Sequence, residues 1–113
     1  MEQSLEMLRG LQDMGYRTVI TTPHIHKSYY FNTAEEIQAG AEKVRAAMAA
    51  ANIELEFRAA AEYFLDDHFL ELLEHKALLT LDGKRVLIEM SFRVEYVGLR
   101  EVLFQMQARG YQP

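Results

Sequence analysis

The stretch Thr18-Val19-Ile20-Thr21-Thr22-Pro23-His24-Ile25-His26 decides the fold of this 113-residue chain. Its first half is an apolar, β-branched run, which predicts a short buried strand over residues 17–21. The run then meets a proline and two histidines, His24 and His26. In parallel α/β folds, ligands and catalytic groups lie at the carboxyl ends of the strands. We therefore expect the chemistry of this chain at that edge.

Helical and strand patterns alternate on both sides of this stretch. Apolar spacing predicts a helix over residues 3–14, closed by Gly15 as the C-cap glycine. Thr33 and Glu36 form a capping box that opens a helix reaching about Ala51. That helix has Ile37, Ala41, Val44 and Met48 on one stripe, and a strand over residues 53–62 follows it.

Asp66 and Asp67 open the next helix, whose apolar face consists of Phe69, Leu70, Leu72 and Leu73. A third strand is predicted over residues 84–89. The last helix is predicted over residues 94–109, ends at Gly110, and turns inward Val97, Val102 and Met106.

This order predicts an α/β fold with about three parallel strands alternating with four helices. The length suits one small domain but falls short of the roughly 250 residues of a closed α/β barrel. Both ends of the sequence lie against structured patterns, so we expect a part of a larger domain. The segment over residues 22–33 is long for a loop in such a fold, which makes it a functional candidate.

Composition excludes several classes of function. The chain has 17 acidic and 12 basic residues, a net charge of −5, and no basic tract, which argues against nucleic-acid or anionic-membrane partners. No apolar run approaches the roughly 18 residues of a membrane span. The absence of cysteine excludes disulfides, thiolate metal sites and cysteinyl-phosphate chemistry, and is compatible with the cytoplasm, where we expect the protein.

Three residues are predicted at the carboxyl ends of three successive strands: His24, Glu62 and Glu89. Imidazole and carboxylate ligands suit Mn²⁺, Zn²⁺ or Fe. Glu89 directly follows an apolar strand, where a carboxylate is costly unless it is paired or metal-bound. A structural role stays open for each, because His24 could be a loop residue, and Glu62 and Glu89 could pair with Arg58 and Arg93.

Other candidates are weaker. His26 could point into the same cleft as His24, and a solvated loop histidine is an equal alternative. Tyr29 and Tyr30, with Phe31, form either a packed lid, which is favoured, or a platform for an aromatic substrate. His68 and His75 are predicted at the surface. The sequence has no G-x-S-x-G elbow, P-loop or G-x-G-x-x-G motif, so a hydrolase would use metal-activated water.

Three motifs resemble, in order and spacing, the bacterial PHP-type (polymerase and histidinol phosphatase) protein-tyrosine phosphatases of capsule and exopolysaccharide systems. They are Thr21-Thr22-Pro23-His24, Ala60-Ala61-Glu62-Tyr63-Phe64-Leu65-Asp66 and Val86-Leu87-Ile88-Glu89-Met90-Ser91-Phe92. The resemblance covers essentially the whole chain. It implies a distorted TIM-like barrel with about three metal ions, His24, Glu62 and Glu89 as metal ligands, and hydrolysis of phosphotyrosine by a metal-activated hydroxide.

In the family a first His-x-His motif stands before the position of Met1, and His-Pro-Glu-Arg and Asp-x-His segments follow the position of Pro113, so residues 1–113 do not include them. We therefore expect a single partial PHP domain that lacks the N-terminal and C-terminal barrel strands, with weak metal binding and feeble catalysis. Its exposed strand edges favour a homo-oligomer. The resemblance implies a tyrosine kinase of polysaccharide export as the substrate. It also implies a substrate loop that includes His26, Tyr29, Tyr30 and Arg93. Two alternative functions remain: a phosphoesterase of the histidinol-phosphatase type and a non-catalytic α/β interaction module.

Overall fold

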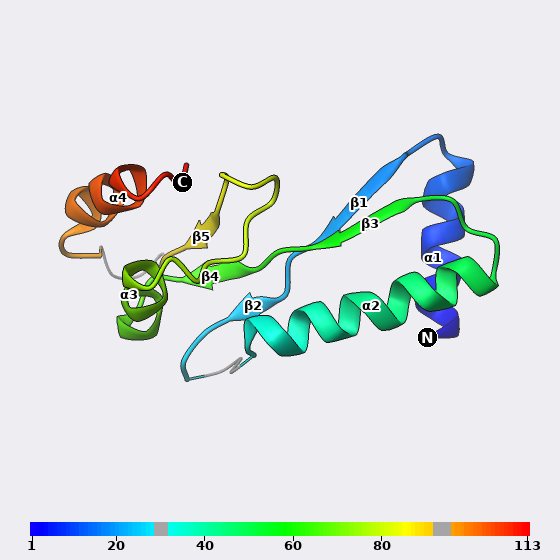
Figure 1. Cartoon of the computed structure of the whole chain (residues 1–113), viewed down its shortest axis with the longest axis horizontal. Coiled ribbons are helices and arrows are strands. Elements are labelled where there is room, and N and C mark those ends of the chain that lie inside the picture. The colour runs from blue at the N-terminus through cyan, green and yellow to red at the C-terminus, as the bar shows by residue number, and fades with distance from the viewer. Residues whose placement is uncertain (29–31, 92–95) are drawn as a thin grey trace.

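A computed structural model describes residues 1–28, 32–91 and 96–113 of the chain. Helices and strands alternate along it, as the sequence predicted (Figure 1). The elements are α1 (Glu2–Asp13), β1 (Thr18–Thr21), β2 (His24–Ile25), α2 (Ala34–Ala50), β3 (Glu56–Ala59), β4 (Glu62–Phe64), α3 (Asp67–Glu74), β5 (Leu87–Glu89) and α4 (Leu99–Ala108). Tyr29, Tyr30, Arg93 and Val94 lie outside the described residues.

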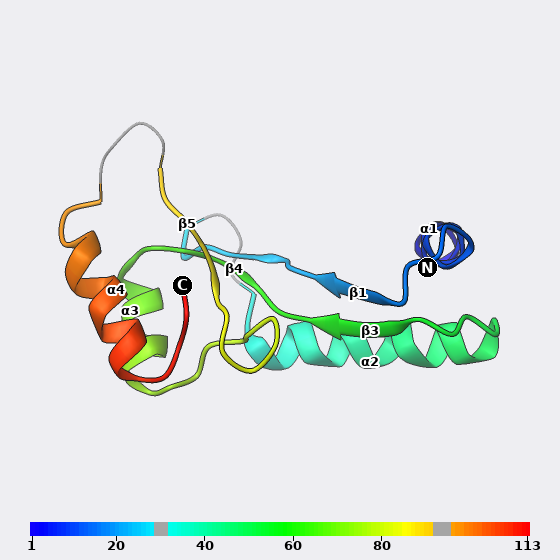
Figure 2. The same cartoon turned by 90° about the horizontal axis from the view of Figure 1, so that it is seen from above.

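Two small parallel sheets divide the molecule into two halves. The β1–β3 pair has α2 running along it and α1 crossing near its amino-terminal end, while β2, β4 and β5 lie in the half that holds α3 and α4 (Figures 1 and 2). Every pairing between the named strands is parallel. The α/β class with four helices is therefore confirmed, and the described residues form no closed barrel.

The strand expected over residues 17–21 forms as β1 and is followed by a second short segment, β2, while the single strand expected over residues 53–62 is replaced by β3 and β4. Thr18 pairs with Glu56 and His24 pairs with Glu62, so the same offset of 38 residues holds on both sides of the break. The Glu62 amide donates to the Pro23 carbonyl at 2.9 Å, but Pro23 has no N–H to return. β1 ends at Thr21 as predicted, and His24 opens the further segment β2. The prediction that the second strand ends at residue 62 was wrong, because Glu62 opens β4.

The helix boundaries follow the predicted caps. Gly15 has φ +99°, a left-handed conformation that glycine adopts without strain, and the Tyr16 amide then donates to the Leu11 carbonyl at 3.1 Å. The Thr33 side chain accepts a hydrogen bond from the Glu36 amide at 3.1 Å, which confirms Thr33 as the N-cap of α2, and its hydroxyl donates to the Glu36 carboxylate at 3.2 Å.

The larger core lies beneath β4. Tyr63, Phe69 and Met106 are fully buried there, and the rings of Tyr63 and Phe69 meet edge to face with centroids 5.7 Å apart. A second, smaller cluster joins α1, α2 and the segment before β3; its buried members are Leu8, Met48, Ile53 and Leu55. The predicted inward stripe of α2 is confirmed, with Val44 only half-buried.

Some predicted burial was wrong. β1 is exposed or half-buried throughout, because within the described residues β3 is its only paired strand. Leu70 is 38% exposed, because α3 turns Phe69 and Leu73 to the core. Leu70 directly follows Phe69, so its side chain lies about 100° further around the helix axis. Val97 is 93% exposed because it precedes α4, which begins only at Leu99.

Candidate metal centre

Strand register brings the three predicted ligands to one face of the second sheet. His24 and Glu62 are register partners on β2 and β4, and Glu89 on β5 is the partner of Phe64. Side chains alternate between the faces of a strand, so the neighbours of these residues point the other way. Those neighbours include Tyr63, which is buried in the larger core. The sheet thus has one apolar, buried face and one half-exposed face that bears the polar cluster.

The polar atoms of the cluster are close enough to share a cation. His24 Nδ1 lies 3.6 Å from Glu62 Oε2 and 3.6 Å from Glu89 Oε1. One atom from each of the three residues lies within 4.8 Å of the other two. First-row metal ions bind such nitrogen and oxygen ligands at about 2.0–2.2 Å. The donor set and its spacing therefore fit a divalent ion of the Mn²⁺, Zn²⁺ or Fe type.

Electrostatics of the site also favour a cation. Burial and the adjacent Glu62 carboxylate raise the pKa of Glu89 above its usual value, while the His24 and His26 imidazoles act in the opposite direction. The side chains of Glu62 and Glu89 are 26% and 36% exposed, so water screens their repulsion only in part. Two carboxylates held this close gain most from a positive ion between them.

His26 lies beside this cluster rather than away from it. It is two residues beyond His24, and its ring stacks on Phe64 with centroids 4.1 Å apart and planes at 28°. The Ser28 amide donates to His26 Nδ1 at 3.1 Å. Phe64 is a residue that the sequence reasoning missed, although its position two residues after Glu62 could have indicated it.

The other candidate residues lie elsewhere. Arg58, considered as a partner for Glu62, forms an ion pair with Glu56 at 3.2 Å. His68 is half-buried on α3, with Nδ1 4.0 Å from a Glu71 carboxylate oxygen, and the exposed His75 has Nδ1 2.8 Å from the Glu71 carbonyl. Neither of these two histidines belongs to the cluster of candidate ligands.

Two side chains fix the strand that bears His24. Asn32 donates from Nδ2 to the His24 carbonyl at 2.9 Å, which ties the end of the loop back to β2. Asp66 caps α3 by accepting from the Phe69 amide at 2.9 Å and also accepts from the Lys27 amide at 3.1 Å. The cap was predicted from the sequence. The bond to Lys27 was missed because it joins residues 39 positions apart.

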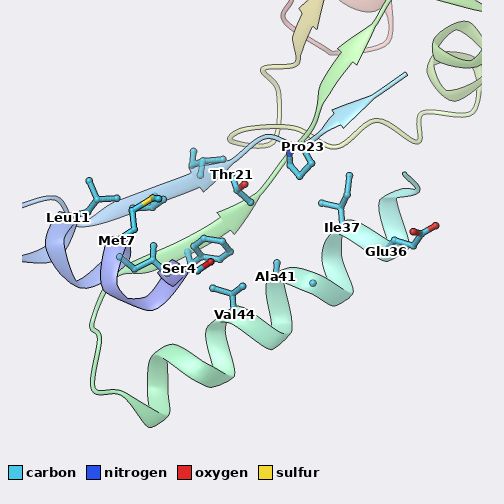
Figure 3. Close-up of a pocket in the computed structure, with 14 residues that line it drawn as sticks. Ser4, Met7, Leu11, Thr21, Pro23, Glu36, Ile37, Ala41 and Val44 are labelled. Carbon is cyan, nitrogen blue, oxygen red and sulfur yellow. The ribbon is translucent and has the colours of Figure 1, made fainter. Parts of the chain in front are cut away.

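An apolar groove of about 520 Å³ lies in the other half of the molecule, between α1, β1 and α2 (Figure 3). Its lining includes Met7, Leu11, Val44 and Ile37, and its one charged residue is Glu36 at the rim. Such a lining offers no set of metal ligands. Among the described residues, the chemistry is therefore concentrated on the polar face of the second sheet.

Comparison with known proteins agrees with this arrangement. The family model described as capsular polysaccharide synthesis, CpsB/CapC, matches residues 1–113. The chain belongs to the CpsB/CapC family. This confirms the resemblance noted from the sequence. None of the described helices of this CpsB/CapC chain is long and apolar enough to cross a membrane.

Two relatives of the CpsB/CapC chain are informative. Tyrosine-protein phosphatase YwqE of Bacillus subtilis strain 168 is 28% identical over 111 residues, which are 97% of this chain and 44% of the relative. A solved structure from the pair YwqE of Bacillus subtilis and CpsB of Streptococcus pneumoniae, described as unique metal-dependent tyrosine phosphatases, matches with a TM-score of 0.82 and 28% identity. It is matched over 96% of this chain and 44% of its own. The chain thus spans less than half the length of these relatives.

Proposed function

We propose that this chain is part of a metal-dependent protein-tyrosine phosphatase that acts on a tyrosine kinase of polysaccharide synthesis or export. The observation that carries the proposal is the His24–Glu62–Glu89 cluster, in a chain matched along its whole length by the CpsB/CapC family. The names of the relatives support the reaction: YwqE is a tyrosine-protein phosphatase, and the matched structure comes from metal-dependent tyrosine phosphatases. We propose the cytoplasm as its location.

His24, Glu62 and Glu89 are the residues that would hold the metal, for which we propose Mn²⁺, with Zn²⁺ or Fe as the alternatives. When bound, a divalent ion supplies Lewis acidity to phosphoryl oxygens and lowers the pKa of bound water. The chain's own residues supply a rigid mount. Asn32 holds the backbone of His24, and the buried ring of Tyr63 lies under the sheet at the same level. Fixing the backbone positions of the ligands in advance lowers the entropy that is lost when an ion binds.

We also propose that residues 1–113 form one part of a PHP barrel domain. Among the described residues β1 pairs with a strand at one edge only, and this supports the proposal, because all-parallel sheets occur almost only in α/β folds whose sheet faces are both covered. The carbonyls of Arg17 and Thr21 accept from the amides of Glu56 and Ala60, at the start of β3 and just after it. Thr18 and Ile20 therefore direct their amides and carbonyls to the opposite edge. The apolar groove beside that edge suits further chain. The same edge supports self-association of the isolated residues.

The test combines metal binding and hydrolysis. Mn²⁺ affinity is measured by titration calorimetry for the wild-type chain and for His24→Ala, Glu62→Ala and Glu89→Ala, each of which should weaken binding tenfold or more. Glu74→Ala and His75→Ala, two exposed residues of the same types near the end of α3, are the matched controls and should change nothing.

Hydrolysis is then measured with a phosphotyrosyl peptide and with histidinol phosphate, with and without chelator. Chelator-sensitive release of phosphate from the peptide supports the proposal. Preference for histidinol phosphate would instead indicate a phosphoesterase of that type. Unchanged Mn²⁺ affinity in all three ligand variants would show that these residues are structural, as in a non-catalytic α/β module.

A further inference from the structure

The polar face of the second sheet has an aromatic row directly beside the candidate ligands. Phe64 follows Glu62 by two residues on β4 and is the register partner of Glu89 on β5. Its side chain therefore projects from the same face as both carboxylates. His26 lies on the other side of Phe64 and stacks on it. His26 and Phe64 together are called the aromatic pair below.

The aromatic pair is held in place by several contacts. The ring centroids are 4.1 Å apart, and the Ser28 amide donates to His26 Nδ1 at 3.1 Å. In this bond His26 Nδ1 is the acceptor, so the contact restricts rotation of the ring. Between His26 and Ser28, the Lys27 amide donates to Asp66, which also caps α3. The pair is thus an ordered surface and not two loose rings.

Packing of the core does not account for this stack. The buried aromatic residues of this half, Tyr63 and Phe69, meet on the opposite face of the sheet. His26 and Phe64 are only half-buried, on the face that bears His24. An aromatic pair at the polar face, next to candidate metal ligands, contributes little to the core and is placed to contact a ligand.

We propose that the aromatic pair is the surface that selects aryl over alkyl phosphates at the His24–Glu62–Glu89 centre. This inference rests on the proposed function, since it assumes that a phosphate group binds at the ligand cluster. Residues two positions apart on a strand lie about 6.6 Å apart. In phenyl phosphate the ring is bonded directly to the ester oxygen. With its phosphate at the ligand cluster, the ring therefore extends over about this distance and reaches the aromatic pair. Aromatic contacts form at centroid distances of about 4.5–7 Å.

Calorimetry tests the inference by binding alone. The Mn²⁺-loaded chain is titrated with phenyl phosphate, methyl phosphate and inorganic phosphate. We expect phenyl phosphate to bind about two- to tenfold more tightly than methyl phosphate, the range of an aromatic contact. Phe64→Leu should bring this ratio close to one, because leucine keeps much of the volume but has no ring. Affinities for Mn²⁺ and inorganic phosphate should stay at their wild-type values.

Two further variants make the test decisive. His26→Gln retains an acceptor for the Ser28 amide and removes the ring, so it should reduce the phenyl-to-methyl ratio. Phe104→Leu, the same exchange at a residue of α4 that is 61% exposed, is the matched control and should leave the ratio unchanged. If Phe64→Leu does not fold, His26→Gln alone still decides. A ratio near one in the wild type, or equal ratios in all variants, would overturn the inference, as would failure to bind phenyl phosphate.

Hydrolysis separates this inference from the proposed function. If the chain binds aryl phosphates preferentially but does not hydrolyse a phosphotyrosyl peptide, the selective role of the aromatic pair is supported and the proposed phosphatase function is contradicted. If the chain hydrolyses that peptide and an alkyl phosphate with equal kcat/KM, and Phe64→Leu reduces both values equally, the phosphatase function is supported. The selective role of the aromatic pair is then contradicted.

Discussion

His24 and Glu62 face each other across β2 and β4 as register partners, with Nδ1 3.6 Å from Oε2. The two residues are 38 positions apart, and α2 lies between them in the chain. Their contact therefore exists only when the parallel pairing forms. Glu89 joins them from β5, which pairs with the other edge of β4. The candidate site is thus a product of sheet topology, and any change that disturbs this pairing should disperse it.

Without metal, Glu89→Gln should stabilise the chain, because it removes a negative charge beside Glu62. The gain should be on the order of 1 kcal/mol, the interaction of two unit charges about 4 Å apart in a water-like dielectric. With Mn²⁺ at 100 times its Kd, the wild type should gain about 2.7 kcal/mol. Glu89→Gln should gain clearly less, so the order of stability reverses.

Urea unfolding with and without Mn²⁺ measures both effects. Glu74→Gln, an exposed glutamate at the end of α3, is the control and should follow the wild type in both conditions. Equal stabilisation of wild type and Glu89→Gln by Mn²⁺ would contradict a ligand role for Glu89.

The sequence predicted the order of elements and the meeting of His24, Glu62 and Glu89, because both follow from local patterns and the parallel α/β rule. It could not predict the break in the strands. Thr22-Pro23 and Ala60-Ala61 look like strand continuations or loop residues until they are paired, and only then does the missing N–H of Pro23 interrupt the ladder. The stack of His26 on Phe64 is likewise a cross-strand contact, which depends on register and not on spacing along the chain.

Tyr63→Phe should destabilise the chain at neutral pH by about 1–3 kcal/mol. The Leu79 amide donates to the Tyr63 hydroxyl at 2.6 Å, and the exchange would leave this donor unpaired in a half-buried position. Tyr16→Phe, at a residue that is 56% exposed, is the control and should have little effect. Denaturant unfolding at pH 7 measures the difference.

The same tyrosine should make stability depend on alkaline pH. Burial raises the pKa of Tyr63 above its usual value of about 10, and the hydrogen bond from Leu79 acts in the opposite direction. The folded state therefore holds the phenolic proton more tightly than the unfolded state. This contribution is fully present below about pH 10 and is lost as pH rises above it. The gap in stability between wild type and Tyr63→Phe should narrow as pH rises above about 10; a constant gap would contradict the assignment.

Two glycines should respond to alanine in opposite directions. Gly15 has φ +99°, so Gly15→Ala should cost roughly 1–2 kcal/mol through left-handed strain. Gly40 lies inside α2, where Gly40→Ala should stabilise by about 0.5–1 kcal/mol. An added Cβ meets nothing within 4 Å at either position, so the contrast isolates backbone conformation. Thermal unfolding of the two variants measures whether each exchange raises or lowers the stability. A loss of stability in both variants would contradict the expected stabilisation by Gly40→Ala.

Asp66 should anchor both α3 and the segment that carries His26, and two exchanges separate these roles. Asp66→Ala removes both acceptors and should cost about 1–2 kcal/mol, the usual loss for an N-cap. Asp66→Asn retains one acceptor oxygen for the Phe69 amide, but its amide nitrogen cannot accept from Lys27. Hydrogen exchange should therefore accelerate at Lys27 alone in Asp66→Asn and at both amides in Asp66→Ala.

Asp67→Ala is the matched control for this pair of exchanges, because Asp67 is exposed in the first turn of the same helix. It should change stability by no more than about 0.5 kcal/mol and leave exchange at Lys27 as in the wild type. Loss of the hydrogen bond from the Lys27 amide to Asp66 should also weaken the stack of His26 on Phe64, since Lys27 directly follows His26. If Asp66→Asn leaves exchange at Lys27 unchanged, the bond across 39 residues does not order the histidine.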